Sequence, residues 1–351
     1  MGSLSTPLLL GVFVAGAIAI WVAGTSLSKA TDVIDRRFNL GEALGGMILL
    51  SIAGTLPEIA ITVSAAAKGN LELAAGNLIG GIAVQTMVLV LCDAAASRRQ
   101  SLTYLVGSLI PVLEALLVVL VVSIVMMGAL LPESTSIGPV SPASLAIVGA
   151  WLAGLFALNR VRKSPAWKVE MPGSAPGRPH RRQVHPDEKP TPITKSTSRA
   201  LIAFGIGCLI TLVAGVILEV AGNDLANRAK INGVIFGATV LSVASALPEI
   251  SSGIAAVRLG DNELAVSDIF GGNSFQLCLF LVADLVAGKA ILPQAGNLDA
   301  WLAALGIALT VIYAFGVIMR DENCVLRLGR DSILALVVFG LGIAGLFVIP
   351  H

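Results

Sequence analysis

The chain contains long runs of apolar residues with few or no charges, and these runs limit the folds open to it. A spanning helix needs roughly 17 to 25 mostly apolar residues, and backbone groups inside a bilayer must be satisfied within helices or closed barrels. Of the 351 residues, 56% are apolar and 13% are charged, whereas a soluble protein carries about 25% charged residues. We therefore expect an all-α integral membrane protein.

Ten runs are long enough to span a bilayer, five in each half of the chain. They cover residues 7–28, 41–67, 71–95, 103–130 and 142–159, then 200–222, 232–257, 263–287, 298–319 and 332–350. The segment between the halves, 160–198, is rich in proline and basic residues, a composition typical of a flexible linker. The predicted organisation is a five-helix repeat (1–159), a basic linker (160–198) and a second five-helix repeat (199–351).

The distribution of Lys and Arg predicts the orientation, because positively charged loops stay in the cytoplasm. With ten spans both termini share one side, and that side carries only Lys68, Arg228, Lys230 and Lys289 of the 23 basic residues. We expect the termini outside and the linker in the cytoplasm, in a membrane of the bacterial cytoplasmic type. The net charge of +1 gives no indication of nucleic-acid binding. Membrane lipid and transported cations are the expected partners, and the sequence does not indicate an oligomeric state.

An internal repeat relates the two halves at an offset of 191 residues. Ser51–Ile59 (SIAGTLPEI) aligns with Ser242–Ile250 (SVASALPEI), and Gln85 and Asp93 align with Gln276 and Asp284. Each half has an odd number of spans, so the second copy must enter the membrane from the opposite side. This inverted repeat is typical of secondary transporters, whose site lies near the midplane at the repeat interface.

Glu58 and Glu249 are the repeated acids, and each follows a proline deep within a predicted span. A charged glutamate there costs roughly 2.5 to 3.5 kcal/mol and indicates a functional site. The alternative is a glutamate neutralised by a basic partner, but no Lys or Arg lies at the middle of the predicted spans. Pro57 and Pro248 should free the carbonyls of Ala53 and Ala244 in the preceding helical turn.

Other oxygen-bearing side chains share helical faces with these glutamates. Hydroxyls precede each glutamate, and amides or acids follow at four-residue steps on the next span. The predicted metal ligands are therefore Glu58, Glu249, Gln85, Gln276, Ser51, Thr55, Ser242, Ser245, Asn77, Asp268 and Asn273. A set of hard oxygen ligands is the kind that calcium prefers. A single amide in a membrane helix is more often an interhelical contact, so the ligand role of Gln85 and Gln276 depends on their recurrence.

These motifs resemble the two alpha repeats of the calcium/cation antiporter superfamily, which has the sodium/calcium exchanger fold. LPEI followed by GN-LIGG, and LPEI followed by SD-IFGGN, match a family pattern close to GTSLPE and GN-IGSN-FN. The resemblance implies that Glu58 and Glu249 bind calcium, with Gln85 and Gln276 completing the site. The chain departs from the pattern at Gly81 and Gly272, where the family has a serine, and at the Gly-Thr-Ser hydroxyls.

The resulting hypothesis is secondary active exchange of a divalent cation, calcium first, by alternating access. Without these hydroxyls, the predicted site resembles that of the calcium/proton branch of the superfamily. A carboxyl group removed from water can also take up protons near neutral pH. Protons or sodium are thus the predicted counter-ions, and no cofactor or enzymatic activity is expected. The alternatives are a sodium-driven calcium exchanger, an exchanger of another divalent metal and a cation channel. An intramembrane hydrolase is disfavoured because all three His lie in the linker or at the C-terminus.

Three further acids lie in predicted spans without an assigned role. Asp93 and Asp284 follow the two glutamines by eight residues, which places them about 12 Å along the helix, near a membrane face. Either an ion vestibule or a contact at a helix end would explain them. Glu114 has no acidic counterpart in the second half, and we expect a structural contact there rather than a proton relay.

Overall fold

The computed structural model describes residues 4–38, 52–96, 100–163 and 197–349, and most of them are helical. The helices of the first half are α1 (Thr6–Phe38), α3 (Leu56–Ala67), α4 (Leu71–Ala95), α5 (Leu102–Leu105), α6 (Ile110–Ala129), η2 (Glu133–Thr135) and α7 (Pro142–Lys163). Those of the second half are α8 (Thr197–Ala229), α9 (Gly233–Phe236), η3 (Gly237–Leu241), α10 (Ser242–Ser245), α11 (Leu247–Arg258), α12 (Asn262–Gln276), α13 (Leu279–Ala287), η4 (Leu292–Gln294), α14 (Asn297–Met319) and α15 (Arg330–Leu346). Two short strands, β1 (Cys324–Val325) and β2 (Leu328–Gly329), pair antiparallel between α14 and α15.

The architecture is that of a membrane protein. Within the described residues, seven helices are long and apolar enough to span a bilayer, or eight if the bent pair of Gly233–Ser245 and Leu247–Arg258 counts as one span. The helices α3 and α15 are shorter, with 12 and 17 residues. The number of ten spans therefore stays a prediction. Most of the predicted linker and the start of the span predicted at 41–67 lie outside the described residues.

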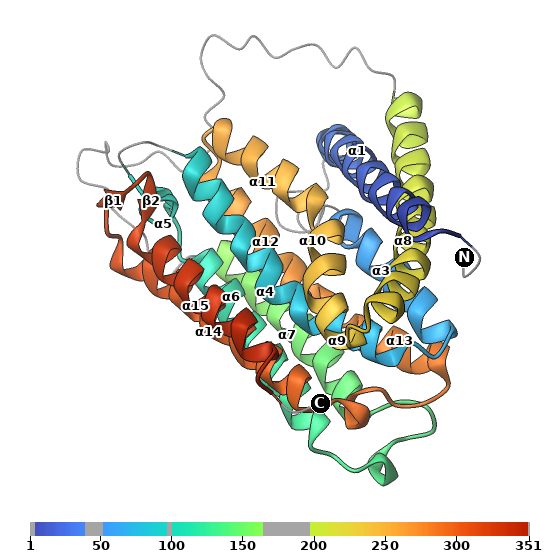
Figure 1. The fold of residues 1–351 in the computed structure, drawn as a ribbon. Coiled ribbons are helices and arrows are strands. Elements are labelled where there is room, and N and C mark those ends of the chain that lie inside the picture. Colours follow the sequence, from blue (N-terminus) through green and yellow to red (C-terminus); the bar gives the residue numbers. More distant parts are fainter. Residues whose placement is uncertain (1–3, 39–51, 97–99, 164–196, 350–351) are drawn as a thin grey trace.

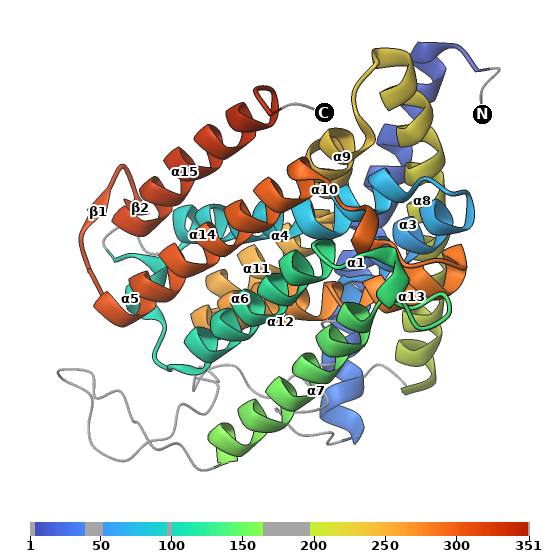
Figure 2. The ribbon, with the colours of Figure 1, turned by 90° about the horizontal axis from the view of Figure 1, so that it is seen from below.

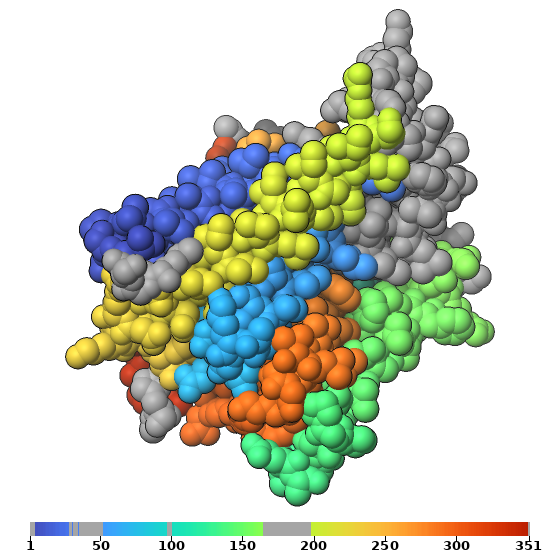
Figure 3. All heavy atoms as spheres, turned by 90° about the vertical axis from the view of Figure 1, so that its right-hand side faces the viewer, coloured from blue at the N-terminus to red at the C-terminus, as the bar shows by residue number. Residues whose placement is uncertain are grey.

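Two long helices, α1 and α8, pack along each other more extensively than any other pair. They lie at one side of the molecule, with α14 and α15 at the opposite side (Figures 1 and 2). The space-filling view shows α1 and α8 side by side across one face (Figure 3). Apolar side chains of α8 such as Leu201, Ile206 and Leu209 are exposed on the protein, as expected where lipid is the surrounding solvent. In contrast, α4 is the most buried of the spans.

Two glycines bring this helix pair close to the helices that carry the repeated Pro-Glu motifs. A Cβ atom on Gly24 of α1 would lie 2.4 Å from Cβ of Pro248 on α11. A Cβ atom on Gly215 of α8 would lie 2.6 Å from Cβ of Ala60 and 3.1 Å from the carbonyl oxygen of Pro57, on α3. Gly24 and Gly215 are themselves 191 residues apart. The same close helix contact therefore occurs in both halves, as small residues allow in membranes.

Several of the predicted spans contain a break in the helix. In 103–130 the chain leaves the helix between α5 and α6, and Pro111 becomes the second residue of α6. In 232–257 a π-helical turn (η3) and a break at Ala246 divide the span, with a bend of 46°. In 263–287 a turn at Leu277 and Cys278 separates α12 from α13. The prolines of the first two spans start new helices instead of lying inside old ones, because the first helical positions need no amide donor.

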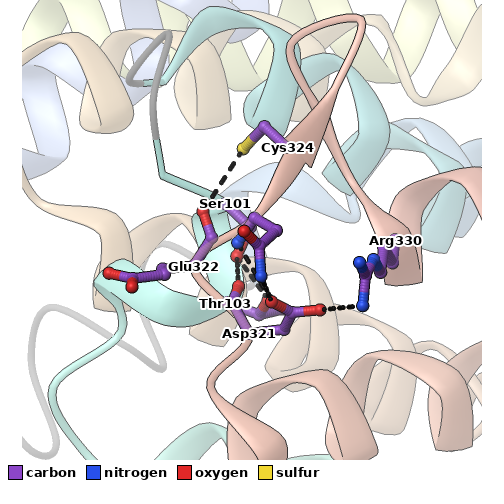
Figure 4. Close-up of polar contacts among 7 residues, drawn as sticks. Ser101, Thr103, Asp321, Glu322, Cys324 and Arg330 are labelled. Atoms are coloured by element: carbon purple, nitrogen blue, oxygen red, sulfur yellow. Dashed lines mark hydrogen bonds and ion pairs between the residues drawn. The ribbon is translucent and has the colours of Figure 1, made fainter.

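The loop after α14 is tied to the segment after α4 by polar contacts (Figure 4). Ser101 Oγ donates to the carbonyl oxygen of Asp321 at 2.7 Å, and the Asp321 carboxylate pairs with Arg330 at 3.1 Å. The backbone amide and the side-chain amide of Asn323 both donate hydrogen bonds to the Asp321 carboxylate. These bonds lower the pKa of that carboxyl below its usual value. These contacts connect the first half of the chain to the β1–β2 hairpin of the second.

Candidate functional site

The two glutamates lie at the starts of broken helices. Glu58 is the third residue of α3, which begins after Thr55, and Glu249 is the third residue of α11, which begins after Ala246. Their exposed fractions are 1% and 6%. The backbone amides and the dipole at a helix N-terminus favour a negative charge. Each proline thus places its glutamate at the positive end of a new helix.

A pair of glutamines joins the two halves beside Glu58. Gln85 Nε2, on α4, donates to Glu58 Oε1 at 3.0 Å and to Gln276 Oε1, at the end of α12, at 2.9 Å. Gln276 Nε2 in turn donates to the carbonyl oxygen of Leu78 at 2.8 Å. A Cβ atom on Gly81 would lie 2.4 Å from Gln276 Nε2. The glycine that replaces the family's serine here therefore makes room for the partner glutamine.

The hydroxyl groups near the glutamates are buried but mostly bonded to the backbone. Thr55 Oγ1 donates to the carbonyl oxygen of Ile52 at 3.3 Å, and Ser242 Oγ donates to that of Gly237 at 2.7 Å. Ser245 Oγ likewise donates to a backbone oxygen, the carbonyl of Ser242, at 3.2 Å. Ser51 lies outside the described residues.

The two asparagines differ in their surroundings. Asn77 on α4 is fully buried, and neither side-chain atom has a hydrogen-bond partner among the described residues. Asn273 Nδ2 on α12 donates to Thr86 Oγ1 at 3.2 Å. The Asn77 amide is thus available to a ligand, whereas that of Asn273 is partly used by an interhelical contact.

Asp268 lies with Glu249 at the edge of a cavity. Its Oδ2 accepts a hydrogen bond from Ser252 Oγ at 3.0 Å, and its charge acts on the Glu249 carboxylate. Glu249 Oε2 is buried without a hydrogen-bond partner in the described part of the chain. We call this cavity the access chamber; its lining includes Gly24, Leu27, Gly54, Glu249, Ser252 and Asp268.

The donor set consists of carboxylates, amides, hydroxyls and backbone carbonyls, all of them oxygen ligands suited to a hard cation. No group of three or more His, Cys, Asp or Glu that could hold a metal ion was found within the ranges that the structure describes. A cation bound here would therefore depend on neutral oxygens as well as on the acids.

Comparison with known proteins decides the family. The family model described as "Sodium/calcium exchanger protein" matches residues 8–159 and 199–349, most of the chain and both halves. This chain belongs to the sodium/calcium exchanger family. Among curated proteins, this exchanger is 25% identical to "Inner membrane protein YrbG" of Escherichia coli K12 over 289 residues, 82% of this chain and 83% of the relative.

Solved structures share the exchanger fold at low sequence identity. The H+/Ca2+ exchanger CAX superimposes with a TM-score of 0.68 at 14% identity, covering 98% of this chain and 82% of the other. The sodium-calcium exchanger NCX_Mj superimposes with a TM-score of 0.61 at 17% identity, covering 97% and 99%. The resemblance inferred from the motifs is thereby confirmed at the level of family and fold.

Asp93 and Asp284 form contacts at helix ends in this exchanger, one of the two predicted alternatives. Asp93 accepts from the amides of Leu102 and Gly329, each at 2.7 Å. Asp284 accepts from the amide of Ile291 at 2.8 Å and from Ser144 Oγ at 2.6 Å. Both acids therefore use their oxygens to hold the segments that follow their helices, at related places in the two halves.

Two further buried acids, Glu114 and Glu219, pair with basic residues. Glu114 Oε1 on α6 pairs with Arg162 Nη2 of α7 at 3.0 Å, which agrees with the expected structural contact. Glu219 on α8 is fully buried and was not singled out from the sequence, although it lies within the predicted span 200–222. It accepts from Lys68, from Ser64 at 2.7 Å and from Asn70 at 2.8 Å. The feature of the sequence that could have indicated Glu219 is that it is a single acid in an apolar run, with no acid at the related position of the other half.

Proposed function

We propose that this chain is a secondary active antiporter that exchanges a divalent cation, with calcium as the first candidate, for protons or sodium by alternating access. The observation that carries the proposal is the meeting of repeat-related groups: Glu58, Gln85 and Gln276 are joined by hydrogen bonds of 3.0 and 2.9 Å. Glu249 Oε1 lies 3.5 Å from where a Cβ atom on Gly54, four residues before Glu58, would stand. Two acids and several neutral oxygens at one buried point suit a divalent cation.

Protons are the counter-ion that the chemistry of the site favours. Two carboxyl groups can hold either one divalent cation or two protons, and the net charge of the loaded site is the same in both cases. Sodium exchange would draw on hydroxyl ligands, and Gly54, Gly81 and Gly272 provide none. The similar structures include both an H+/Ca2+ exchanger and a sodium-calcium exchanger, so both counter-ions belong in the test.

In the proposed orientation the termini face outward and the basic linker lies in the cytoplasm of a bacterial-type cell. The argument is the excess of Lys and Arg in the linker and in the loops on the same side, such as Arg98, Arg99 and Arg320. The loop between α11 and α12 and the loop between α14 and α15 then lie on the cytoplasmic side.

The test is calcium uptake by proteoliposomes containing the purified protein. With an acidic lumen and no sodium, we expect calcium to accumulate against its gradient while protons leave. Glu58→Gln and Glu249→Gln should each reduce uptake to the level of protein-free vesicles, because each removes a charged ligand that no neighbour replaces.

Other outcomes point to the competing functions. Uptake that requires a sodium gradient and ignores a pH gradient would identify a sodium-driven exchanger. Calcium movement that only runs downhill, at a rate independent of both gradients, would identify a channel. If another divalent ion, such as manganese, outcompetes calcium at equal concentration, calcium is not the main substrate.

A further inference from the structure

Among the described residues, the lining of the access chamber includes Glu249 and not Glu58. Gly24 and Leu27 of α1 line it together with Ser252 and Asp268. Glu249 is buried, and its Oε2 has no hydrogen-bond partner in the described chain. A buried carboxylate oxygen without a donor is costly, so an unpaired oxygen facing a chamber indicates a place for a cationic ligand.

The repeat provides an internal comparison for this half of the site. The positions related to Gly54, Ser252 and Asp268 are Ser245, Ile61 and Asn77. All three are buried, whereas Ser252 and Asp268 are partly exposed. An acid and a hydroxyl therefore line the chamber, and a neutral amide and an apolar side chain occupy the repeat-related positions.

The two glutamates also differ in the side chains that surround them. Glu58 Oε1 accepts from Gln85 at 3.0 Å, and its Oε2, like Glu249 Oε2, has no hydrogen-bond partner among the described residues. Gly54, at the position related to Ser245, leaves Glu249 without the equivalent hydroxyl: even an added Cβ atom would lie 3.5 Å from Glu249 Oε1. In the described residues no ion pair joins Asp268 to a Lys or Arg.

We propose that Glu249, Asp268 and Ser252 form a second cation site in the access chamber, which captures a divalent cation before it reaches Glu58. The inference rests on the proposed antiport function. It adds that the cation binds in the chamber first, and that it does so from one side of the membrane. Two carboxylates and a hydroxyl supply part of the oxygen shell that such a cation needs. Asp268 determines the affinity on one side of the membrane only, because the other repeat has Asn77 in its place.

The first experiment measures the half-saturating calcium concentration separately from each side of sealed vesicles of known orientation. Asp268→Asn copies the residue of the other repeat and keeps the shape of the side chain. Loss of one charge close to a divalent cation should raise the half-saturating concentration about tenfold on the chamber side. The value on the opposite side should stay within about twofold, since Asn77 and Glu58 are unchanged there. Glu322→Gln, which removes an exposed acid from the loop after α14, is the matched control and should change neither side.

A second experiment reports occupancy without transport. Ser252→Cys, in protein whose four natural cysteines are replaced, is treated with a small membrane-impermeant thiol reagent from each side. We expect labelling from one side only, slowed by calcium, and no slowing by calcium when Asp268→Asn is added. Labelling from both sides at equal rates, or labelling that calcium does not slow, would overturn the proposal.

The two experiments separate this inference from the proposed function. If the wild-type protein exchanges calcium for protons but Asp268→Asn leaves both half-saturating concentrations unchanged, the chamber site is wrong and the antiport function stands. If the wild-type protein moves no calcium in exchange for any counter-ion, and calcium still protects the substituted position 252, the chamber binds the cation and the antiport function is wrong.

Discussion

At the scale of single residues, the two repeats place the same side chain in unlike surroundings. Glu58 and Glu249 both occupy the third position of a helix that restarts after a break. Glu58 accepts a hydrogen bond from Gln85, whereas Glu249 lines the access chamber. The symmetry between the repeats thus determines where the acids lie, and the departures from symmetry decide which of them a cation meets first.

A methyl group at Gly81 should disrupt the glutamine pair. In Gly81→Ala the new Cβ atom would lie 2.4 Å from Gln276 Nε2, so the Gln276 amide must move away from Gln85. We expect exchange to fall about tenfold, the effect of losing roughly 1.4 kcal/mol of ligand positioning.

The repeat supplies the control for this substitution. A Cβ atom on Gly272, 191 residues later, would have no neighbouring atom within 4 Å, and Gly272→Ala should keep nearly full exchange. Equal losses in the two variants, measured as initial uptake rates in proteoliposomes, would show that the close approach at Gly81 is not what holds the pair.

Loss of the Glu219 carboxylate should destabilise the protein. Glu219 accepts from Lys68, Ser64 and Asn70 and is fully buried, so Glu219→Ala leaves several donors unpaired. Breaking a buried ion pair costs about 3 to 5 kcal/mol, and the partial exposure of Lys68 favours the lower end. The thermal midpoint in detergent should fall clearly, while Glu133→Ala, which removes an exposed acid, should leave it unchanged. A midpoint for Glu219→Ala equal to wild type would mean that the ion pair contributes nothing.

At the scale of helices, the sequence predicted positions well and interruptions poorly. The predicted spans 71–95 and 298–319 agree with α4 and α14 to within one residue, because apolar runs with charged or turn-forming ends define both limits. The structure has breaks before α3, α6 and α11, whose positions the apolar runs alone do not give. A proline inside an apolar run is compatible with a kink or with a new helix, and only packing against neighbouring helices decides between them.

The candidate site was predictable where both repeats carry the signal. Glu58 and Glu249 recur, as do Gln85 and Gln276, and the structure brings the two glutamines into contact. Ser252 and Glu219 occur in one half only, and nothing in the sequence marks their partners, which come from other helices. Groups assembled by tertiary contact alone are invisible to repeat analysis.

At the scale of the whole molecule, the α1–α8 pair contacts the site helices through matching glycines. Gly24 approaches Pro248 and Gly215 approaches Pro57 and Ala60, so each long helix packs on the broken helix of the opposite repeat. Any movement of the pair relative to α3 and α11 would therefore change these two contacts.

Bulk at either glycine should slow exchange. Gly24→Val and Gly215→Val push the long helices away from α11 and α3, and we expect the maximal exchange rate to fall about tenfold in each, as expected for a barrier raised by about 1.4 kcal/mol. Gly11→Val in α1 and Gly205→Val in α8 add the same bulk where no atom lies within 4 Å, and these controls should behave like wild type. The maximal exchange rates are measured at saturating calcium. Equal rates in all four variants would contradict the expectation.

The bond between Gln85 and Gln276 has a consequence for how such proteins diverge. Each amide satisfies part of the other's hydrogen-bonding capacity, so a change at one position leaves the other short of a partner in a place that water does not reach. Across the family, substitutions at positions 85 and 276 should therefore occur together.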